Sequence, residues 1–490
     1  MLPGLLLMGF VLAVTVFLAV EASGTFDSYL YFFLVPWIFA LAVVFITPSA
    51  ILLYQGKFSF ANPIVFATFS YFFPAFVLGG IALAAGWSQP YFVAFIQDAR
   101  YNLPYTIILI MLGFSGLSVG YFLPVGAKIG TWVARLLPVA NYKSTAYFFP
   151  GLLLLALGIF NSIFALALGI IGFQKVDQIS SYDGLIFLTT LFWTQANFLL
   201  WCVIFAQKRL NILQAIVAGV LITTSVIKAL FSGYRGSIIL TFSAIAIAYI
   251  VSGRVFRLKQ IMIASSLLFV LMILGMIYGT TFRQVKGSEA AEDLGLYTEN
   301  IFTTFDQIGR NDNVNLLQFA FANMAERIDA LSPLAVVVSN YEQLAPYEES
   351  YGLDNNIWKD TTTFFIPRVL WPDKPVASEL RKYSDLYFNY GESSFTITPI
   401  GDLLRNFGVL GIPVGMLLLG IALRVIYRAL IDDQPIVVWR ATLYFMLLSA
   451  VTYDAFYGSI APALFKNGAA AVVGILIVNT LARYVRFKRK

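Results

Sequence analysis

Two short motifs in an otherwise apolar chain combine arginine, aspartate, proline and glycine at close spacing. The first, residues 364–375, places Arg368 directly after a proline and just before a Trp-Pro pair. The second, residues 400–408, places Asp402 three residues before Arg405. The planar guanidinium of arginine matches phosphate oxygens in a bidentate way. These motifs therefore indicate a phosphate-binding site, although Arg368 could instead hold its segment to a carboxylate.

Further candidate residues lie near the ends of apolar segments. Lys228 precedes a tight turn that contains Tyr234 and Arg235. A positive charge this close to hydrocarbon usually has a partner or a function, but both cations could also extend to lipid headgroups. Arg327 follows Glu326 and could form a local ion pair.

Two more charged residues follow the second motif. Asp454 and Lys466 lie near the ends of the last two apolar segments, where they could simply pair with each other. Asp402 and Arg405 would share one face of a helix that begins near Pro399, just above the membrane. Asp402 could also serve only to complement the dipole of that helix.

The composition requires a membrane protein. Of the 490 residues 59% are hydrophobic and 12% are charged, and the mean hydropathy is +0.80. A soluble domain of this composition would lack polar groups to cover its surface. Apolar runs of about 20 residues, the length that crosses a bilayer as a helix, recur along the chain. We predict an all-α polytopic protein with about twelve spans (ten to fourteen), near 1–20, 29–53, 62–86, 104–124, 147–172, 185–206, 210–230, 236–251, 258–281, 408–427, 437–454 and 462–482.

Charge predicts the orientation of these spans. If both termini are cytoplasmic, every inner segment carries Lys or Arg, and Asp432 and Asp433 are the only inner acidic residues. The long segment 282–407 is then exoplasmic and acidic. The pI of 9.1 reflects this topology and does not indicate nucleic acid as a partner.

Several kinds of site are excluded by residue counts. The chain has no histidine and one cysteine, Cys202. Histidine-ligated metals, thiolate clusters, a histidine base and internal disulfides are therefore excluded, and we predict no metal and no cofactor. Any general base must be a carboxylate.

The organisation predicts three parts: nine spans in 1–281, a partly helical loop domain in 282–407, and three spans with a basic tail in 408–490. Within the loop, 311–331 has the spacing of an amphipathic helix and 334–338 could form a second short helix. We detect no internal repeat, which lowers the expectation of a repeat-based transporter.

These features together resemble the Wzy-type O-antigen and oligosaccharide repeat-unit polymerases. The resemblance covers residues about 225–425 and rests on Ser-Gly-Tyr-Arg-Gly at 232–236, Ala-Glu-Arg at 325–327, the Pro-Arg-Val-Leu-Trp-Pro-Asp-Lys-Pro run at 367–375 and Gly-Asp-Leu-Leu-Arg-Asn-Phe-Gly at 401–408. It implies a GT-C-like membrane glycosyltransferase in the bacterial inner membrane. Such an enzyme transfers a glycan from polyprenyl diphosphate to a hydroxyl of a new lipid-linked repeat unit. A chain-length regulator and a flippase are partners that the resemblance suggests.

The implied reaction assigns roles to the candidates. Cations would hold the diphosphates, and Asp402, or else Asp454, would be the base. The predicted catalytic residues are Asp402, Arg405, Arg368 and Arg235. The predicted substrate-binding residues are Lys228, Arg327, Tyr234, Trp371, Lys374, Asp454 and Lys466.

Other functions stay open at this point. O-antigen ligases share the general plan, but as a family they are associated with an essential exoplasmic histidine that this chain lacks. A lipid-linked oligosaccharide flippase or other carrier would have charges near the middle of the bilayer, whereas the candidates here are expected at its outer edge. A noncatalytic assembly partner is the remaining alternative.

Overall fold

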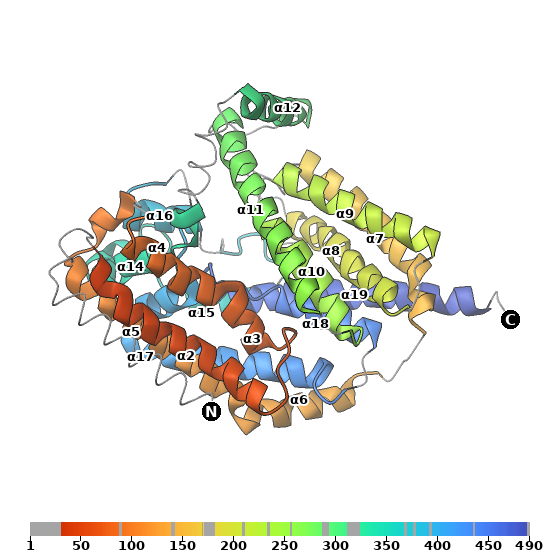
Figure 1. Ribbon diagram of the computed structural model, residues 1–490, viewed down its shortest axis with the longest axis horizontal. Helices are drawn as coiled ribbons and strands as arrows, with labels where there is room; N and C mark the ends of the chain where they lie inside the picture. Colours follow the sequence, from red (N-terminus) through yellow and green to blue (C-terminus); the bar gives the residue numbers. More distant parts are fainter. Residues whose placement is uncertain are drawn as a thin grey trace.

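The computed structural model describes residues 31–87, 91–138, 143–168, 170, 182–207, 211–232, 236–254, 257–286, 294–310, 324–366, 370–375, 379–391, 394–434 and 437–487. All regular elements within these ranges are helices (Figure 1). The longest are α2 (Val35–Tyr54), α5 (Ala99–Phe122), α7 (Phe148–Ala167), α8 (Asp183–Phe205), α9 (Ile212–Ser232), α11 (Leu258–Lys286), α17 (Thr398–Leu430) and α19 (Ile460–Phe487). The shorter α-helices are α6 (Pro124–Leu136), α10 (Gly236–Val251), α12 (Leu294–Arg310), α14 (Leu331–Leu344), α15 (Asn356–Thr363), α16 (Leu380–Phe388) and α18 (Val438–Leu448). Another continuous helix, Pro63–Ala84, consists of α3 (Pro63–Ala67), the π-helical η3 (Thr68–Leu78) and α4 (Gly79–Ala84).

The described part of the chain is an all-helical polytopic membrane protein. Nine of its helices are long and apolar enough to cross a membrane, and two shorter apolar helices, Leu240–Val251 and Val438–Leu448, accompany them. These eleven helices coincide with eleven of the twelve predicted spans. The remaining predicted span, 1–20, lies outside the described residues.

Glycines allow a close backbone contact between α5 and α17. A Cβ on Gly116 would come within 2.6 Å of the carbonyl oxygen of Pro413. A Cβ on Gly120 would overlap the carbonyl oxygen of Leu417. The contacts advance along both helices in the same direction, so the two helices are parallel. Small residues allow such close backbone approach between membrane helices.

Helix α17 folds back on itself at Gly408. This glycine has φ 66° and ψ −167°, a conformation that other residues rarely adopt. The Leu403 side chain packs against Gly415, although twelve residues of straight helix would separate these positions by about 18 Å. Residues 398–407 therefore form an arm that lies beside the rest of α17. We expected this arm above the membrane-spanning part, but Ile400 packs on Gly113, in the middle of α5.

Part of the predicted loop domain is buried in the bundle. The predicted short helix at 334–338 is confirmed as the middle of α14, whose residues Leu331–Val338 are all buried. They belong to the same hydrophobic core as α2, α5 and α17. Of the predicted amphipathic helix, 311–323 lies outside the described residues and 324–328 is helical. Residues from several parts of the described range 331–404, such as Leu353, Tyr383 and Phe388, thus belong to the core of the spans.

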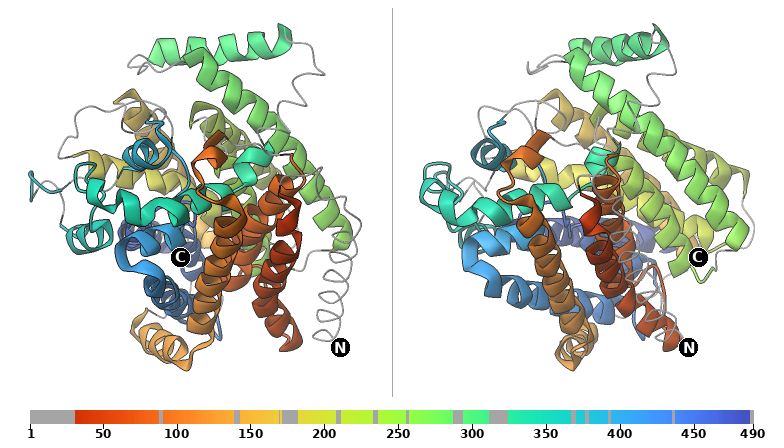
Figure 2. Two further views of the ribbon diagram at one scale, coloured as in Figure 1. Left: turned by 90° about the vertical axis from the view of Figure 1, so that its left-hand side faces the viewer. Right: turned by 60° about the vertical axis from the view of Figure 1, so that its left-hand side comes forward.

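Helix α12 lies across the end of α11, apart from the other helices (Figure 2). The contact consists of Tyr278 and Phe282 of α11 with Ile301 of α12. The ring centres of Tyr278 and Phe305 are 5.5 Å apart. In contrast to α14, this part of the predicted loop packs on α11, next to Leu230 of α9.

The glycine contact between α5 and α17 predicts a position-specific effect of one added methyl group. Gly120→Ala would force two backbones apart, which we expect to cost about 1–3 kcal/mol of stability. The control is Gly219→Ala on α9, because a Cβ there meets nothing within 4 Å. Thermal unfolding of both variants in detergent measures the difference. Equal melting temperatures would contradict the packing described.

Candidate functional site

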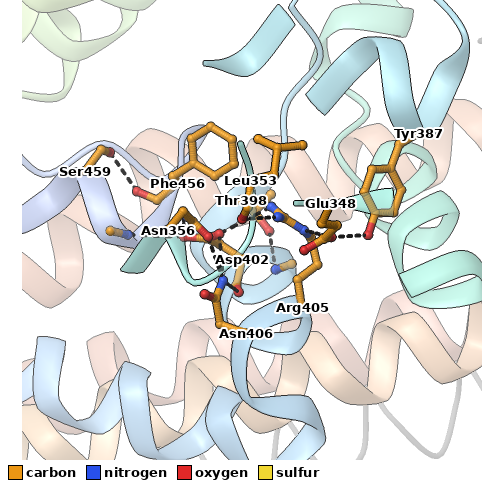
Figure 3. Close-up of polar contacts among 12 residues, drawn as sticks. Glu348, Leu353, Asn356, Tyr387, Thr398, Asp402, Arg405, Asn406, Phe456 and Ser459 are labelled. Carbon is orange, nitrogen blue, oxygen red and sulfur yellow. Dashed lines mark hydrogen bonds and ion pairs between the residues drawn. The ribbon is translucent and has the colours of Figure 1, made fainter. Parts of the chain in front are cut away.

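A buried polar network forms where α15, α16, α17 and the turn after η6 (Ala345–Tyr347) meet (Figure 3). The Arg405 side chain is 0% exposed. Its Nε donates to Glu348 Oε1 at 2.6 Å, its Nη2 to the Leu353 carbonyl oxygen at 3.0 Å, and its Nη1 lies 3.5 Å from Asp402 Oδ1. The Tyr387 hydroxyl donates to the same Glu348 oxygen at 2.8 Å. Each guanidinium nitrogen thus has an acceptor within the protein.

Both carboxylate oxygens of Asp402 are also occupied. Oδ2 accepts from the Gly458 backbone N–H at 3.1 Å and from Asn356 Nδ2 at 3.2 Å. On the other side, Asn406 Nδ2 lies 3.3 Å from Asp402 Oδ1 and donates to Asn356 Oδ1 at 2.7 Å. Asp402 is 0% exposed. The network therefore encloses this carboxylate.

The local sequence explains how these groups meet. Pro399 stands in the first turn of α17, where proline is well tolerated. The three-residue spacing then puts Asp402 and Arg405 on one face, as predicted. Gly458, in η7 (Tyr457–Ser459), allows its backbone to approach α15, since a Cβ there would lie 3.0 Å from Ile357 Cα.

The network fixes the folded arm of α17 to three distant segments. Arg405 Cζ lies 5.8 to 5.9 Å from the ring centres of Tyr383, Tyr387 and Phe456. A buried charge with this many partners is costly to disrupt. In this structure Arg405 and Asp402 bind the protein itself, and neither is open to a substrate.

Two neighbouring glutamates test this structural role. Glu348→Gln removes the charge that faces the buried guanidinium, and we expect a loss of about 3 kcal/mol. The matched control is Glu349→Gln, because Glu349 is exposed. Thermal unfolding in detergent gives both values, and a Glu348→Gln variant as stable as the control would show that the network does not hold the fold.

Asp454 lies in an irregular segment, in contrast to Asp402. Helix α18 has 11 residues, or about 17 Å of helix, roughly half of a bilayer core. Residues 449–456 then continue without helical structure. Along them Val451 and Tyr453 are buried, whereas Thr452 and Asp454 are exposed. Irregular backbone at membrane depth requires burial in protein or a water-filled cavity.

A second irregular helix packs against this segment. The rings of Tyr71, in η3, and Tyr453 are stacked with centres 5.9 Å apart, and Phe72 lies 5.0 Å from Tyr453. The Tyr71 hydroxyl is buried, and among the described residues it has no hydrogen-bond partner. Asp454 directly follows Tyr453, on which the Tyr71 ring stacks. π-Helical stretches are frequent at functional sites.

The surroundings of Asp454 suit a proton acceptor. Its carboxylate is exposed, so it can come within hydrogen-bond reach of a hydroxyl proton. Lys466, which the structure also describes, forms no ion pair with Asp454 and is exposed. The alternative that the two residues simply pair with each other is therefore wrong for this structure.

Lys228 lies in a polar strip between α8 and α9. Its Nζ donates to Thr194 Oγ1 at 3.2 Å and lies 5.1 Å from the Trp193 ring centre. One turn away, Asn197 Nδ2 donates to Ser225 Oγ at 3.0 Å. Within the described residues no carboxylate contacts Lys228. This cation is costly at membrane depth and is available to an anion.

The remaining predicted site residues are not gathered at one point. Lys374 Nζ donates to the Ile366 carbonyl oxygen at 2.9 Å and so holds its own segment together. Trp371 is half-buried and Arg327 is exposed. Tyr234, Arg235 and Arg368 lie outside the described residues.

Asp329 caps α14 next to the π-helical stretch. Its Oδ1 accepts from the backbone N–H groups of Leu331 at 2.9 Å and Ser332 at 3.0 Å. The adjacent Ala330 N–H donates to the Ala75 carbonyl oxygen at 3.1 Å. Asp329 is 3% exposed, and burial raises its pKa to about 6.

This shift predicts a pH-dependent stability. The native pKa of Asp329 lies above its ordinary value of 3.8. The contribution of this group to the free energy of unfolding is therefore complete below about pH 4 and is lost as the pH rises through 6. A rise of about two pKa units corresponds to about 3 kcal/mol in the free energy of unfolding. Asp329→Asn should therefore be more stable than wild type at pH 7 and similar at pH 4. Thermal unfolding of wild type and Asp329→Asn between pH 4 and 7 checks this prediction, with the exposed Asp373→Asn as control. An Asp329→Asn variant with the same pH dependence of stability as wild type would refute it.

A family model for a domain of unknown function, DUF8712, matches residues 135–429, which is 295 of the 490 residues. The chain belongs to the DUF8712 family. Searches of curated proteins and of solved structures found no match.

The DUF8712 match contains most of the polar network and neither of the two irregular regions. Arg405, Asp402 and their partners Glu348 and Asn356 lie inside it. Asp454 follows residue 429, together with Gly458, and the π-helical η3 precedes residue 135. The geometry around Asp454 thus depends on parts of the chain at both ends of the match.

Several residues of the polar network, and the capping residue Asp329, were not predicted from the sequence. Asn406 follows Asp402 by four residues, a helical spacing that could have indicated it. Asp329 precedes the apolar run that begins at Leu331, as a capping residue does. No local pattern links Glu348 or Asn356 to Asp402. Among the described residues, no group of three acidic, Cys or His side chains could hold a metal ion.

Proposed function

We propose that this DUF8712 protein polymerises polyprenyl-diphosphate-linked oligosaccharide repeat units into a surface polysaccharide, such as O-antigen, capsule or exopolysaccharide. The observation that carries the proposal is Asp454, an exposed carboxylate on irregular backbone inside a helical bundle. Transfer to a hydroxyl requires such a base. The sequence resemblance supplies the substrate class.

The proposed reaction forms one glycosidic bond and breaks one bond to phosphate. Asp454 accepts the proton of the acceptor hydroxyl as its oxygen attacks the anomeric carbon of the donor glycan. The bond from that carbon to the diphosphate breaks, and polyprenyl diphosphate leaves. Lys228, with Arg235 and Arg368, would stabilise the negative charge on the leaving group.

Asp454 takes the role of base in place of Asp402. The contacts of Asp402 with Gly458, Asn356 and Asn406 leave no oxygen free for a substrate hydroxyl. A general base must come within hydrogen-bond reach of the proton that it removes. In this proposal Asp402 and Arg405 hold the folded arm of α17 in position.

We further propose that the active site opens to the outer face of a bacterial inner membrane, with both termini cytoplasmic. Support comes from the polar side chains at the two ends of the bundle. Arg424 and Arg428 lie at one end of α17, and Gln97 contacts Asn340 beside the opposite end of the parallel α5. The basic end would be cytoplasmic. A chain-length regulator and a flippase would act with the enzyme.

Glycan elongation by purified protein tests the proposal. With a lipid-linked repeat unit in proteoliposomes, wild type should give a ladder of products on a gel. Asp454→Asn should reduce elongation by about 10²-fold or more, because it removes the base. Exposed Asp98→Asn is the control and should retain the ladder. Wild-type elongation should also fall at acidic pH as Asp454 becomes protonated.

Transport is the second candidate function, because α18 ends after 11 residues and the chain continues as irregular backbone. Discontinuous helices at mid-depth are typical of secondary transporters. The same proteoliposomes separate the two functions. Movement of the lipid-linked unit between leaflets without any ladder would refute polymerisation and support a flippase. Transfer of the glycan to a different acceptor, with no ladder, would instead indicate a ligase-like enzyme.

A further inference from the structure

Helix α6 has an apolar face that no described part of the chain covers. Val125, Ile129, Trp132 and Leu136 recur at helical spacing and are 48%, 43%, 61% and 66% exposed. Such a stripe with a tryptophan is typical of a helix at a membrane interface.

The opposite face of α6 is fixed to α17. Gly126, Gly130 and Ala134 are buried there. A Cβ on Gly130 would lie 2.9 Å from the Val425 carbonyl oxygen, and Arg428 Nε donates to Thr131 Oγ1 at 3.1 Å. The exposed stripe therefore has a fixed direction.

Two cations border the apolar stripe. Lys128 and Arg135 are both exposed, and seven residues, or about 10 Å, separate them along one edge of the helix. Neither forms an ion pair within the described residues. The arginines of the neighbouring α17 differ, because Arg424 and Arg428 both contact Asp432. The charge at α6 is thus left for an external partner.

The position of α6 determines what this partner is. The helix begins at Pro124, two residues after the membrane-length α5 ends at Phe122. It is therefore held at the depth where acyl chains give way to headgroups. We propose that α6 binds acidic phospholipids, with the apolar stripe among acyl chains and Lys128 and Arg135 at the phosphates. This site does not depend on the proposed enzymatic activity.

Quenching by brominated lipids tests the site in the full chain. Proteoliposomes of phosphatidylcholine receive a minor fraction of dibrominated phosphatidylglycerol or, in parallel, of dibrominated phosphatidylcholine. The contribution of Trp132 is the difference between wild type and Trp132→Phe. We expect brominated phosphatidylglycerol to quench Trp132 more strongly than brominated phosphatidylcholine.

Charge variants test whether Lys128 and Arg135 cause the preference for brominated phosphatidylglycerol. Lys128→Gln with Arg135→Gln should weaken the preference by about fivefold for each charge removed. The charge-matched control is Lys143→Gln with Lys259→Gln, because both of these lysines are exposed on other parts of the chain, and it should keep the preference. An equal loss in the control would assign the effect to net charge and overturn the proposal.

The wild-type measurement keeps the proposal testable if the charge variants fail to fold. Equal quenching of Trp132 by the two brominated lipids would overturn it, since the headgroup would then make no difference. No quenching of Trp132 by either lipid would also overturn it and would indicate that another protein or a second copy covers α6.

Discussion

The buried guanidinium of Arg405 imposes the strongest constraint on this structure. A charge inside an apolar bundle must be fully satisfied, because the desolvation cost is otherwise several kcal/mol. Arg405 meets this requirement with Glu348 and Leu353 from one segment and Asp402 from its own helix. Since Glu348 and Leu353 precede Arg405 by more than fifty residues, the charge fixes how the C-terminal half of the loop returns to the bundle.

The folded arm of α17 follows from the same constraint. Asp402 can accept from Gly458 only because the chain reverses at Gly408 and brings the arm against η7. The arm also has a cost in backbone conformation at its first residue. Thr398, a β-branched residue at the start of the arm, has φ 63° and is buried, and such a conformation persists only where the surroundings enforce it. The polar network provides that enforcement.

The sequence predicted helices well and their interruptions poorly. Apolar runs of bilayer length located eleven helices, and the three-residue spacing of Asp402 and Arg405 predicted their contact. The same runs hid the π-helical stretch Thr68–Leu78 and the early end of α18, because apolar composition continues through both. The sequence also could not predict that α14 is buried, since a run such as Leu334–Val338 suits the interface and the core equally well.

The distribution of charge explains why Arg405 and Lys228 have different capacities to bind an anion. Two carboxylates already face Arg405, so its immediate surroundings carry a net negative charge and would repel a diphosphate. Within the described residues Lys228 has a hydroxyl and an aromatic ring as neighbours, and its charge is not neutralised. Coulomb attraction is strong at low dielectric. An anionic substrate that enters the bundle would therefore be drawn to the strip between α8 and α9 and away from the network around Arg405.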